Sequence, residues 1–443
     1  MRIPHTPPPL DDLLVAALRD NQLLPILSAL PTGLQDSRYY HWDELRFRKP
    51  PAELTHAQWW TGVKLQRRAG RREIPLYDVM GKSFGFVVPD LVDELLHQID
   101  RDGGTLIQLP EDIANKSERD RYLIRSLMEE AITSSQLEGA ATTREVAKKM
   151  LTEGRAPRDR SEVMILNNFQ TMQRIMEVKK EPLTPALVLD IHHRVSNGAL
   201  DTADAAGRLR RPEESIDISN EMTGQVFHVP PPAESLPERL ETMCRFANGA
   251  VPGYFIHPVL RAIILHFWLA YDHPFVDGNG RTARALFYWQ MLHQGYWTFE
   301  FISISQILRQ APVKYGTAFL HTETDGNDLT YFIIHQAEVI RRALGELHDY
   351  VARKSRETRK SMAYLQNQTN LNHRQQAILA HALRHSNHSY SVAGHQNRQG
   401  IAYATARADL LGLAEKGLLD QRKSGKTFVF VAPPDLEARL SGN

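Results

Sequence analysis

The sequence predicts a mainly helical protein with a small β-hairpin near its middle and a separate small domain near its C-terminus. From about residue 118 onward, apolar residues recur at three- and four-residue spacing, as they do on the buried side of a helix. Between residues 207 and 232 this spacing gives way to two short β-prone runs separated by Asn-Glu-Met-Thr-Gly. After residue 373, two helical runs precede two short strands around a Ser-Gly turn.

The bulk composition indicates a globular protein of two or three domains. The chain has 443 residues, of which 42% are hydrophobic and 24% charged, with a net charge of +1 and a mean hydropathy of −0.39. This balance gives no global sign of nucleic-acid or membrane binding. Cys244 is the only cysteine, which excludes an intrachain disulfide and fits a reducing compartment. Without a signal-peptide pattern or a membrane-length apolar run, we expect a cytoplasmic location.

Changes in residue pattern divide the chain into four expected segments. They are an N-terminal region of unclear role (1–115), a helical core (116–352), a charged helical connector (353–372) and a small C-terminal domain (373–435). The first segment gives no motif to which a mechanism can be assigned.

Local signals place several helix ends. Pro89 stands where an amphipathic pattern begins, so we expect a helix to start there. A second helix is expected over about 118–139, with Gly139 as its C-cap. Thr142 and Glu145 have the spacing of a capping box that opens the next helix.

One helix is expected to be central to the core. Residues 257–272 are apolar nearly all round, which is typical of a buried helix. The helix should end near His273, because Pro274 disfavours the helical conformation of the residue before it. Another helix follows the glycines and closes at Gly295. The segment between these helices, His-Pro-Phe-Val-Asp-Gly-Asn-Gly, is therefore a loop held firmly at both ends, which suits it for catalytic groups.

The end of this loop has the features of an anion site. Gly278 and Gly280 permit a close approach of the backbone. The exposed N–H groups at the start of the following helix favour an anion, most often a phosphate. Arg281 and Arg284 are three residues apart on that helix, so both can bind further phosphate oxygens.

Other residues of the loop supply acid–base and metal chemistry. Asp277 is a hard oxygen ligand of the kind that shares a magnesium ion with phosphates. His273 can accept a proton near neutral pH and therefore suits a general base for a hydroxyl nucleophile. Phe275 is expected to face the core and lock the loop. Together these residues predict transfer of a phosphate group from a magnesium nucleotide to a hydroxyl.

The complete string from His273 to Arg284 resembles the signature of the Fic family. It matches His-x-Phe-x-Asp/Glu-Gly-Asn-Gly-Arg-x-x-Arg at every fixed position. The similarity extends from about Leu183, through Gly-Arg-Leu-Arg-Arg and Val-Pro-Pro-Pro, to the motif. It implies a Fic-type helical core that transfers AMP from ATP, with Mg²⁺, to a Ser, Thr or Tyr hydroxyl of a protein.

The resemblance also implies a role for each motif residue. His273 would be the base, Asp277 the magnesium ligand, and Arg284 the residue that holds the γ-phosphate. The cradle for the α- and β-phosphates would be Gly278, Asn279, Gly280 and Arg281. The hairpin over residues 216–229 would be a flap that pairs with the target segment as an added strand. Its contact residues would be Ile216, Ile218, Val226 and Phe227.

A second motif indicates autoinhibition. The sequence from Ser134 to Gly139, Ser-Ser-Gln-Leu-Glu-Gly, fits the family's inhibitory pattern Ser/Thr-x-x-x-Glu-Gly/Asn, in the class whose inhibitory helix precedes the Fic domain. Ser134 and Glu138 share a helix face, and a carboxylate in the last turn is unfavourable unless a cation compensates it. By the resemblance that cation is Arg284.

The C-terminal domain resembles a winged helix-turn-helix. Its helices and hairpin carry eight basic residues against three acidic ones, a local excess of five positive charges. Residues 404–411 would be the recognition helix and residues 422–426 the wing. Contacts to DNA phosphates would come from Arg407, Arg422, Lys423 and Lys426. Winged helices also contact proteins, so both partners remain open.

Several alternatives to AMP transfer onto a target remain. Fic relatives transfer UMP, phosphocholine or phosphate, and the same glutamate could position water for AMP removal. The complete cradle favours AMP. From another class, the chain could be a transcriptional regulator whose core only senses nucleotide. The sequence does not identify the target protein. Self-modification and homodimerisation remain open, and no membrane partner is expected.

Overall fold

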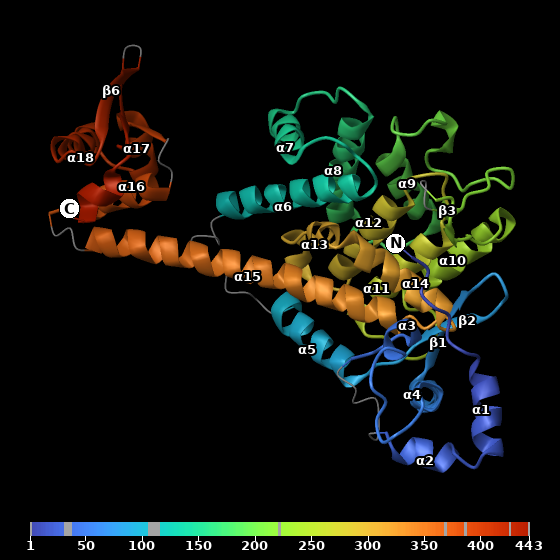
Figure 1. The fold of residues 1–443 in the computed structure, drawn as a ribbon. Coiled ribbons are helices and arrows are strands. Elements are labelled where there is room, and N and C mark those ends of the chain that lie inside the picture. The colour runs from blue at the N-terminus through green and yellow to red at the C-terminus, as the bar shows by residue number, and fades with distance from the viewer. Residues whose placement is uncertain are drawn as a thin grey trace. The chain divides into compact units, whose positions relative to one another are not determined.

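The computed structural model describes residues 2–30, 38–104, 116–219, 223–366, 370–384, 388–424 and 427–441. These residues form two compact units (Figure 1). The first contains the described residues up to 104 and those from 116 to 347, and the second contains those from 348 onward. Within the described residues, no helix combines the length and the apolar content needed to cross a membrane.

The N-terminal part of the first unit is a set of helices around one short β-ribbon. Its elements are α1 (Leu10–Arg19), α2 (Leu23–Ser28), α3 (Trp42–Leu45), α4 (His56–Gly70), the antiparallel strands β1 (Arg72–Tyr77) and β2 (Ser83–Phe86), and α5 (Asp90–Gly104). Thr55 and Gln58 form a capping box that starts α4. The start of α5 at Asp90 confirms the helix expected near Pro89.

The helical core of the first unit surrounds two buried helices. It comprises α6 (Lys116–Leu137), α7 (Arg144–Glu153), α8 (Arg160–Val178), α9 (Pro185–Ser196), α10 (Leu236–Ala247), α11 (Pro258–Asp272), α12 (Asn279–His293), α13 (Ile304–Gln310), α14 (Pro312–Thr324) and α15 (Thr330–Gln366), which continues into the second unit. In Figure 1, α11 and α12 lie in the middle of this group. Nearly every residue of α11 and α12 is buried. The all-round apolar pattern of 257–272 therefore predicted its position correctly.

The turn between α6 and α7 corrects one predicted detail. Gly139 has the left-handed conformation expected of a residue that terminates a helix (φ 90°). The next helix is capped by Thr143, which accepts a hydrogen bond from the Val146 N–H, so the capping box predicted at Thr142 and Glu145 is wrong. Thr142 instead offers its carbonyl to the side chain of Gln136, and the helix begins one residue later.

The β-prone runs form a short antiparallel hairpin. It consists of β3 (Ile218–Ser219) and β4 (Val226–His228), with Ile218 opposite His228. Ile216 precedes β3. The strands are much shorter than the predicted 216–229 segment, and Val226 is exposed whereas His228 is buried.

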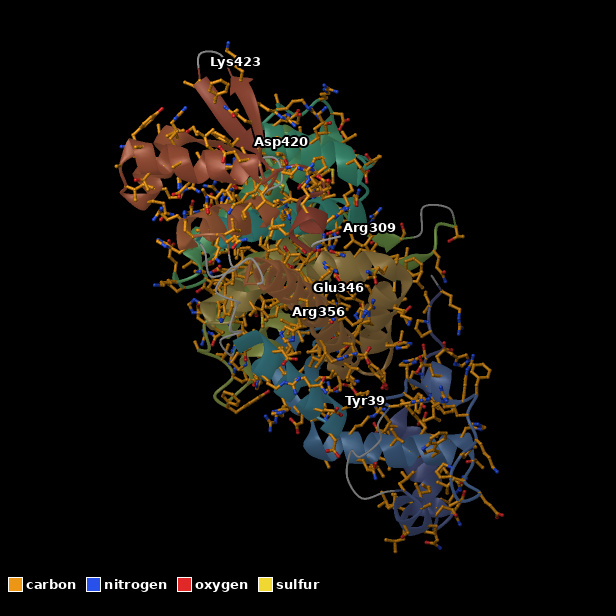
Figure 2. All side chains as sticks on the ribbon, turned by 90° about the vertical axis from the view of Figure 1, so that its left-hand side faces the viewer. Tyr39, Arg309, Glu346, Arg356, Asp420 and Lys423 are labelled. Carbon is orange, nitrogen blue, oxygen red and sulfur yellow. The ribbon has the colours of Figure 1, made fainter. Side chains whose placement is uncertain are left out.

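The second unit is a small α/β body with its own core. After the end of α15 come α16 (His373–Arg384), β5 (Ser389–Ser391), α17 (Val392–Gln399), α18 (Tyr403–Glu415), β6 (Asp420–Ser424), β7 (Thr427–Val431) and α19 (Leu436–Ser441). The three strands form an antiparallel sheet in the order β5-β7-β6. Figure 2 shows Lys423 near the outer end of the β6–β7 hairpin and Asp420 near its base. Lys426 lies outside the described residues.

A buried carboxylate connects three elements of the second unit. Asp409 on α18 accepts hydrogen bonds from Arg374 on α16, Asn372 and the ring of His395 on α17. Burial raises the pKa of Asp409, but these three donors outweigh burial and hold its pKa at about 2. The resulting stabilisation is present above the ordinary pKa of aspartate and is lost as the pH falls toward about 2.

We expect Asp409→Ala to lower the free energy of unfolding of the second unit by about 2–3 kcal/mol, because it leaves the His395 ring and the Arg374 guanidinium without their shared acceptor. Hydrogen exchange of the α16 and α18 amides in the full chain measures this change. Asp420→Ala, which removes an exposed carboxylate 3.8 Å from Arg422, is the control and should leave the exchange unchanged. Equal effects of the two variants would contradict the assigned role of Asp409.

Candidate active site

The candidate site is centred on the motif loop (residues 273–278), which connects the C-terminus of α11 to the N-terminus of α12. His273 caps α11 in a left-handed conformation (φ 43°, ψ 56°), which is unfavourable for a residue with a side chain. Arg210 holds it there: its Nε donates to the His273 carbonyl (3.0 Å) and its backbone N–H donates to the Pro274 carbonyl (2.9 Å). Such a strained position persists because its surroundings fix it.

The His273 ring has the properties of a general base. Its Nδ1 faces the Ala270 carbonyl at 3.3 Å, so Nδ1 carries the hydrogen and Nε2 is the basic nitrogen. Burial, together with the positive charges of His228 and Arg210, lowers the pKa of His273 to about 4, although the Ala270 carbonyl and Glu138 act in the opposite direction. The ring is therefore neutral at neutral pH and can accept a proton.

The loop is rigid because its own side chains brace it. Phe275 is fully buried, as predicted, and stacks on the His192 ring with a centroid distance of 3.6 Å. The side chain of Asn279 accepts from the Phe275 N–H (3.0 Å) and donates to the Phe275 carbonyl (2.8 Å). Because Asn279 uses its amide within the loop, its backbone N–H is the group it can offer to a ligand.

An anion already lies at the N-terminus of α12. Gly278 caps this helix with φ 84°. At Gly280, a Cβ would overlap the carboxyl group of Glu138 from the end of α6. The carboxylate of Glu138 therefore occupies the space against the first turn of α12, where the helix N-terminus favours negative charge.

Arg284 is fully engaged with the α6 segment. Its Nη2 lies 2.9 Å from Glu138 Oε1, and its Nε and Nη2 donate to the Ser134 hydroxyl (2.8 Å) and carbonyl (3.0 Å). Burial of the guanidinium lowers the pKa of Arg284, but Glu138, together with Tyr315 and Glu130, outweighs burial and raises it. The structure thus brings Ser134, Glu138 and Arg284 together across about 150 residues of sequence.

Arg281 has unused hydrogen-bonding capacity. It is fully buried, and its Nη1 donates to the Val195 carbonyl at 3.1 Å. Its Nε and Nη2 have no hydrogen-bond partner among the described residues, and Asp277 is 3.5 Å from Nη2. Burial lowers the pKa of Arg281. A buried cation with two free N–H groups fits an anionic ligand such as a phosphate.

Asp277 fits a magnesium ion that is shared with phosphates. Its side chain is 40% exposed, so its outer oxygen is accessible, with Arg160 at 3.4 Å. Among the described residues, no group of three or more His, Cys, Asp or Glu side chains could hold a metal ion alone. One accessible carboxylate beside an anion site is the arrangement in which Mg²⁺ keeps its waters and takes the remaining ligands from the nucleotide.

Sequence reasoning missed three residues that support the loop. They are Arg210, His192 and His228. His192 Nε2 donates to the Asp277 carbonyl (2.9 Å), and its Nδ1 accepts from the Gly207 N–H (3.0 Å). Their partners lie far away in sequence, so no local spacing indicates these contacts. The predicted flap residues lie on or beside β3 and β4.

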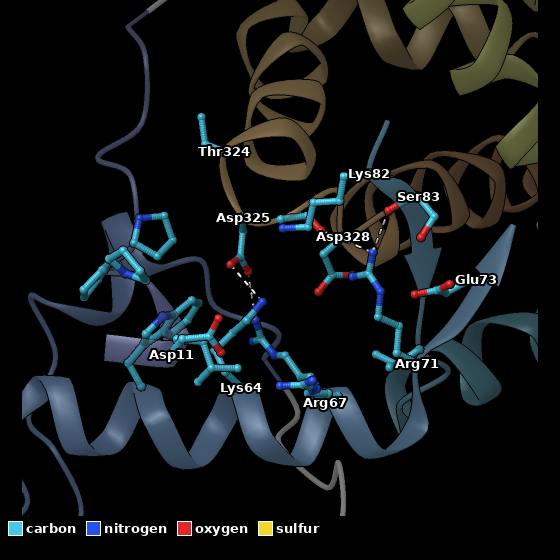
Figure 3. Close-up of a pocket in the computed structure, with 18 residues that line it drawn as sticks. Asp11, Lys64, Arg67, Arg71, Glu73, Lys82, Ser83, Thr324, Asp325 and Asp328 are labelled. Atoms are coloured by element: carbon cyan, nitrogen blue, oxygen red, sulfur yellow. Dashed lines mark hydrogen bonds and ion pairs between the residues drawn. The ribbon is translucent and has the colours of Figure 1, made fainter. Parts of the chain in front are cut away.

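A separate cavity of about 700 Å³ lies among the N-terminal elements (Figure 3). Lys64 and Arg67 on α4, and Arg71 just after it, face Asp325 and Asp328 across it. Lys64 pairs with Asp325 at 2.9 Å, so much of the charge is neutralised within the cavity wall. None of the motif residues lines this cavity.

Comparison with known proteins agrees with the site. Residues 182–291 match the model of the Fic/DOC family. The chain is 27% identical over 215 residues to the protein adenylyltransferase Fic of Nematostella vectensis, covering 47% of each, and 26% identical to that of Drosophila melanogaster, covering 47% of this chain and 41% of the relative. The chain thus spans about half the length of the curated relatives it matches.

The fold is also similar to a solved structure. The crystal structure of a Fic family protein from Desulfovibrio desulfuricans G20 aligns with a TM-score of 0.54 and 18% identity, over 79% of this chain and 98% of that one. The family match spans α9, the hairpin, α10, α11 and nearly all of α12, with the motif loop inside it. Residues 182–291 of this chain are therefore similar to the Fic/DOC family, and this segment contains the complete motif loop.

Proposed function

We propose that this chain is an autoinhibited protein adenylyltransferase. It transfers AMP from Mg-ATP to a Ser, Thr or Tyr hydroxyl of a target protein, and its own chain is included among the targets. The observation that carries the proposal is the pairing of a neutral, half-buried His273 with an anion site at the start of α12. Relatives named as Fic adenylyltransferases support the type of reaction.

In the proposed transfer, each group of the site has a task. His273 Nε2 takes the proton from the attacking hydroxyl, whose oxygen forms a bond to the α-phosphorus of ATP. The bond between the α-phosphorus and the bridging oxygen breaks, and pyrophosphate leaves. The free N–H groups of Arg281 and the N-terminus of α12 stabilise the negative charge on the phosphates. A magnesium ion on Asp277 would neutralise further phosphate charge.

The same contacts explain the inhibition. While Glu138 pairs with Arg284, that arginine cannot hold a terminal phosphate. The Glu138 carboxylate also lies where an anion would approach Gly280, so it repels the nucleotide as well as excluding it. Replacing Glu138 removes both obstacles and leaves the cradle intact.

The direct test uses ATP labelled on the α- or the γ-phosphate, with the wild type, Glu138→Gly, and Glu138→Gly combined with His273→Ala. We expect protein-bound label only from α-labelled ATP. Glu138→Gly should raise it at least tenfold, since a charge-assisted hydrogen bond is worth about 1.5–3 kcal/mol, and His273→Ala should abolish it.

Glu145→Gly is a matched control, because it removes an exposed carboxylate in the first turn of α7 and should not raise labelling. Label from γ-labelled ATP would overturn the assignment to AMP transfer. Bound ATP without label in any variant would support a nucleotide-sensing regulator instead.

The pH dependence of labelling tests the role of His273. A general base works when unprotonated, so the rate should fall only as the pH drops through the lowered pKa of about 4. In Glu138→Gly the rate should begin to fall at the same or a lower pH, because the Glu138 carboxylate that is removed acts to raise the pKa of His273. Initial rates from about pH 5 to 7 should therefore be nearly flat. A limb near the ordinary histidine value would contradict the assignment, provided circular dichroism shows the same fold across the range.

A second candidate function is DNA binding by the second unit. The order helix, strand, helix, helix, strand, strand resembles a winged helix. Arg407 on α18, and Arg422 and Lys423 on β6, are all exposed. Two exposed aromatic side chains, Tyr403 and Phe428, lie on α18 and β7. Exposed cations on a helix and a hairpin favour contacts with phosphates.

We expect the full chain to bind duplex DNA at low salt. Arg407→Ala and the double variant Arg422→Ala/Lys423→Ala should each weaken the affinity by roughly three- to tenfold. Each lost phosphate contact should also reduce the slope of log affinity against log salt concentration by about 1. Fluorescence anisotropy at several salt concentrations measures both. Arg439→Ala on α19, which removes a cation paired with Asp435, is the control. Absence of binding at low salt would leave protein contact as the role of this unit.

A further inference from the structure

The buried ring of His228 ends the flap strand β4 and contacts two other elements. Its Nδ1 lies 2.7 Å from Oε2 of Glu323 on α14, and its Nε2 lies 2.7 Å from the carbonyl oxygen of Tyr271 on α11. A carbonyl oxygen only accepts hydrogen bonds, and so does an ionised carboxylate. Both ring nitrogens must therefore donate, which makes the ring a doubly protonated imidazolium.

The charges around His228 agree with that state. Burial lowers the pKa of His228, but the hydrogen bond and charge of Glu323, the Tyr271 carbonyl and the charge of Asp272 outweigh it and raise the pKa above its ordinary value. Asp272 is already paired with Arg239 on α10 at 2.5 Å and accepts from the Trp268 indole. Glu323 is therefore the carboxylate that holds the proton on His228. Two other titratable groups lie near His228: His273, and the phenol of Tyr271, whose ring centroid is 4.6 Å from that of His228.

His228 and Arg210 together connect the flap to the motif loop. The carbonyl that His228 binds belongs to Tyr271, two residues before His273. The Arg210 guanidinium donates to the carbonyls of both His273 and Pro231, and Pro231 lies three residues after His228. The end of the hairpin is thus attached to the backbone on either side of His273 by two cationic side chains. Their charges also favour the neutral form of His273.

We propose that His228 is a positioning residue for AMP transfer, whose imidazolium fastens the flap strand to the backbone that presents His273. The inference rests on the proposed function. Loss of the ring proton turns one nitrogen into an acceptor that faces another acceptor, so one of the two contacts breaks. The raised pKa fixes the direction: the contact is complete below the ordinary histidine value and is lost as the pH rises through the raised value. The flap then loosens and the rate falls.

The test compares pH–rate profiles of α-labelled AMP transfer in the Glu138→Gly background. The parent should show an alkaline limb. Glu323→Gln should move that limb to lower pH, because the neutral amide no longer stabilises the imidazolium. His228→Gln should lower the rate about tenfold at the acid end and abolish the limb, since one charge-assisted hydrogen bond is lost. Asp100→Asn is the matched control, because Asp100 pairs with His257 at the other end of α11, and its profile should match that of the parent.

Hydrogen exchange provides a readout that does not depend on activity. In otherwise wild-type protein, amides of residues 226–228 should lose protection as the pH rises, after correction for intrinsic exchange. Glu323→Gln should lose this protection at a lower pH than the wild type does, and His228→Gln should lack the protection at every pH. Unchanged protection and unchanged profiles in both variants would overturn the proposal. The predicted exchange pattern without AMP transfer in any variant would overturn the proposed function and leave the fastening by His228 standing.

Discussion

The structure depends on the burial of two arginines in the first turns of α12. Arg281 and Arg284 have essentially no exposed surface, and a buried guanidinium without an acceptor is among the costliest groups in a folded protein. Arg284 is satisfied by Ser134 and Glu138, so the end of α6 must lie against α12. Burial of the two guanidinium groups lowers the local dielectric constant and so strengthens the charge interactions that they make.

The two arginines differ in how many of their N–H groups donate to other residues of the protein. Arg284 donates hydrogen bonds to Ser134 and Glu138, whereas Nε and Nη2 of Arg281 have no hydrogen-bond partner among the described residues. A protein that paired both arginines internally would have to break both sets of contacts to admit a phosphate. Here only the contact of Arg284 with Glu138 must be given up. The observed geometry is therefore close to one that can bind an anion.

Much of the site could be predicted because its signals are local. The motif loop lies within twelve residues, Pro274 marks the end of α11, and Gly139 marks the end of the α6 segment. By contrast, Thr143 and not Thr142 caps α7, and the local sequence does not choose between two adjacent threonines that both have a capping hydroxyl. Strand β5 was missed because its three residues are too few to show an alternation of apolar and polar side chains. Helix α17 was missed because it is mostly polar. Arg210 and His228 act through partners 21 to 95 residues away, and only the folded chain brings them together.

The bare backbone of Gly280 has a consequence for how this protein can change by mutation. The Glu138 carboxylate fits against α12 only because Gly280 has no side chain. A larger residue there would expel the glutamate, yet it would fill the same space that an anionic ligand needs. The Glu138 carboxylate and an anionic ligand thus need the same space beside Gly280. A side chain at position 280 would exclude both of them. Under the proposed function, a substitution that relieves the inhibition and keeps the chemistry must therefore lie on the α6 side, outside the segment that matches the Fic/DOC family.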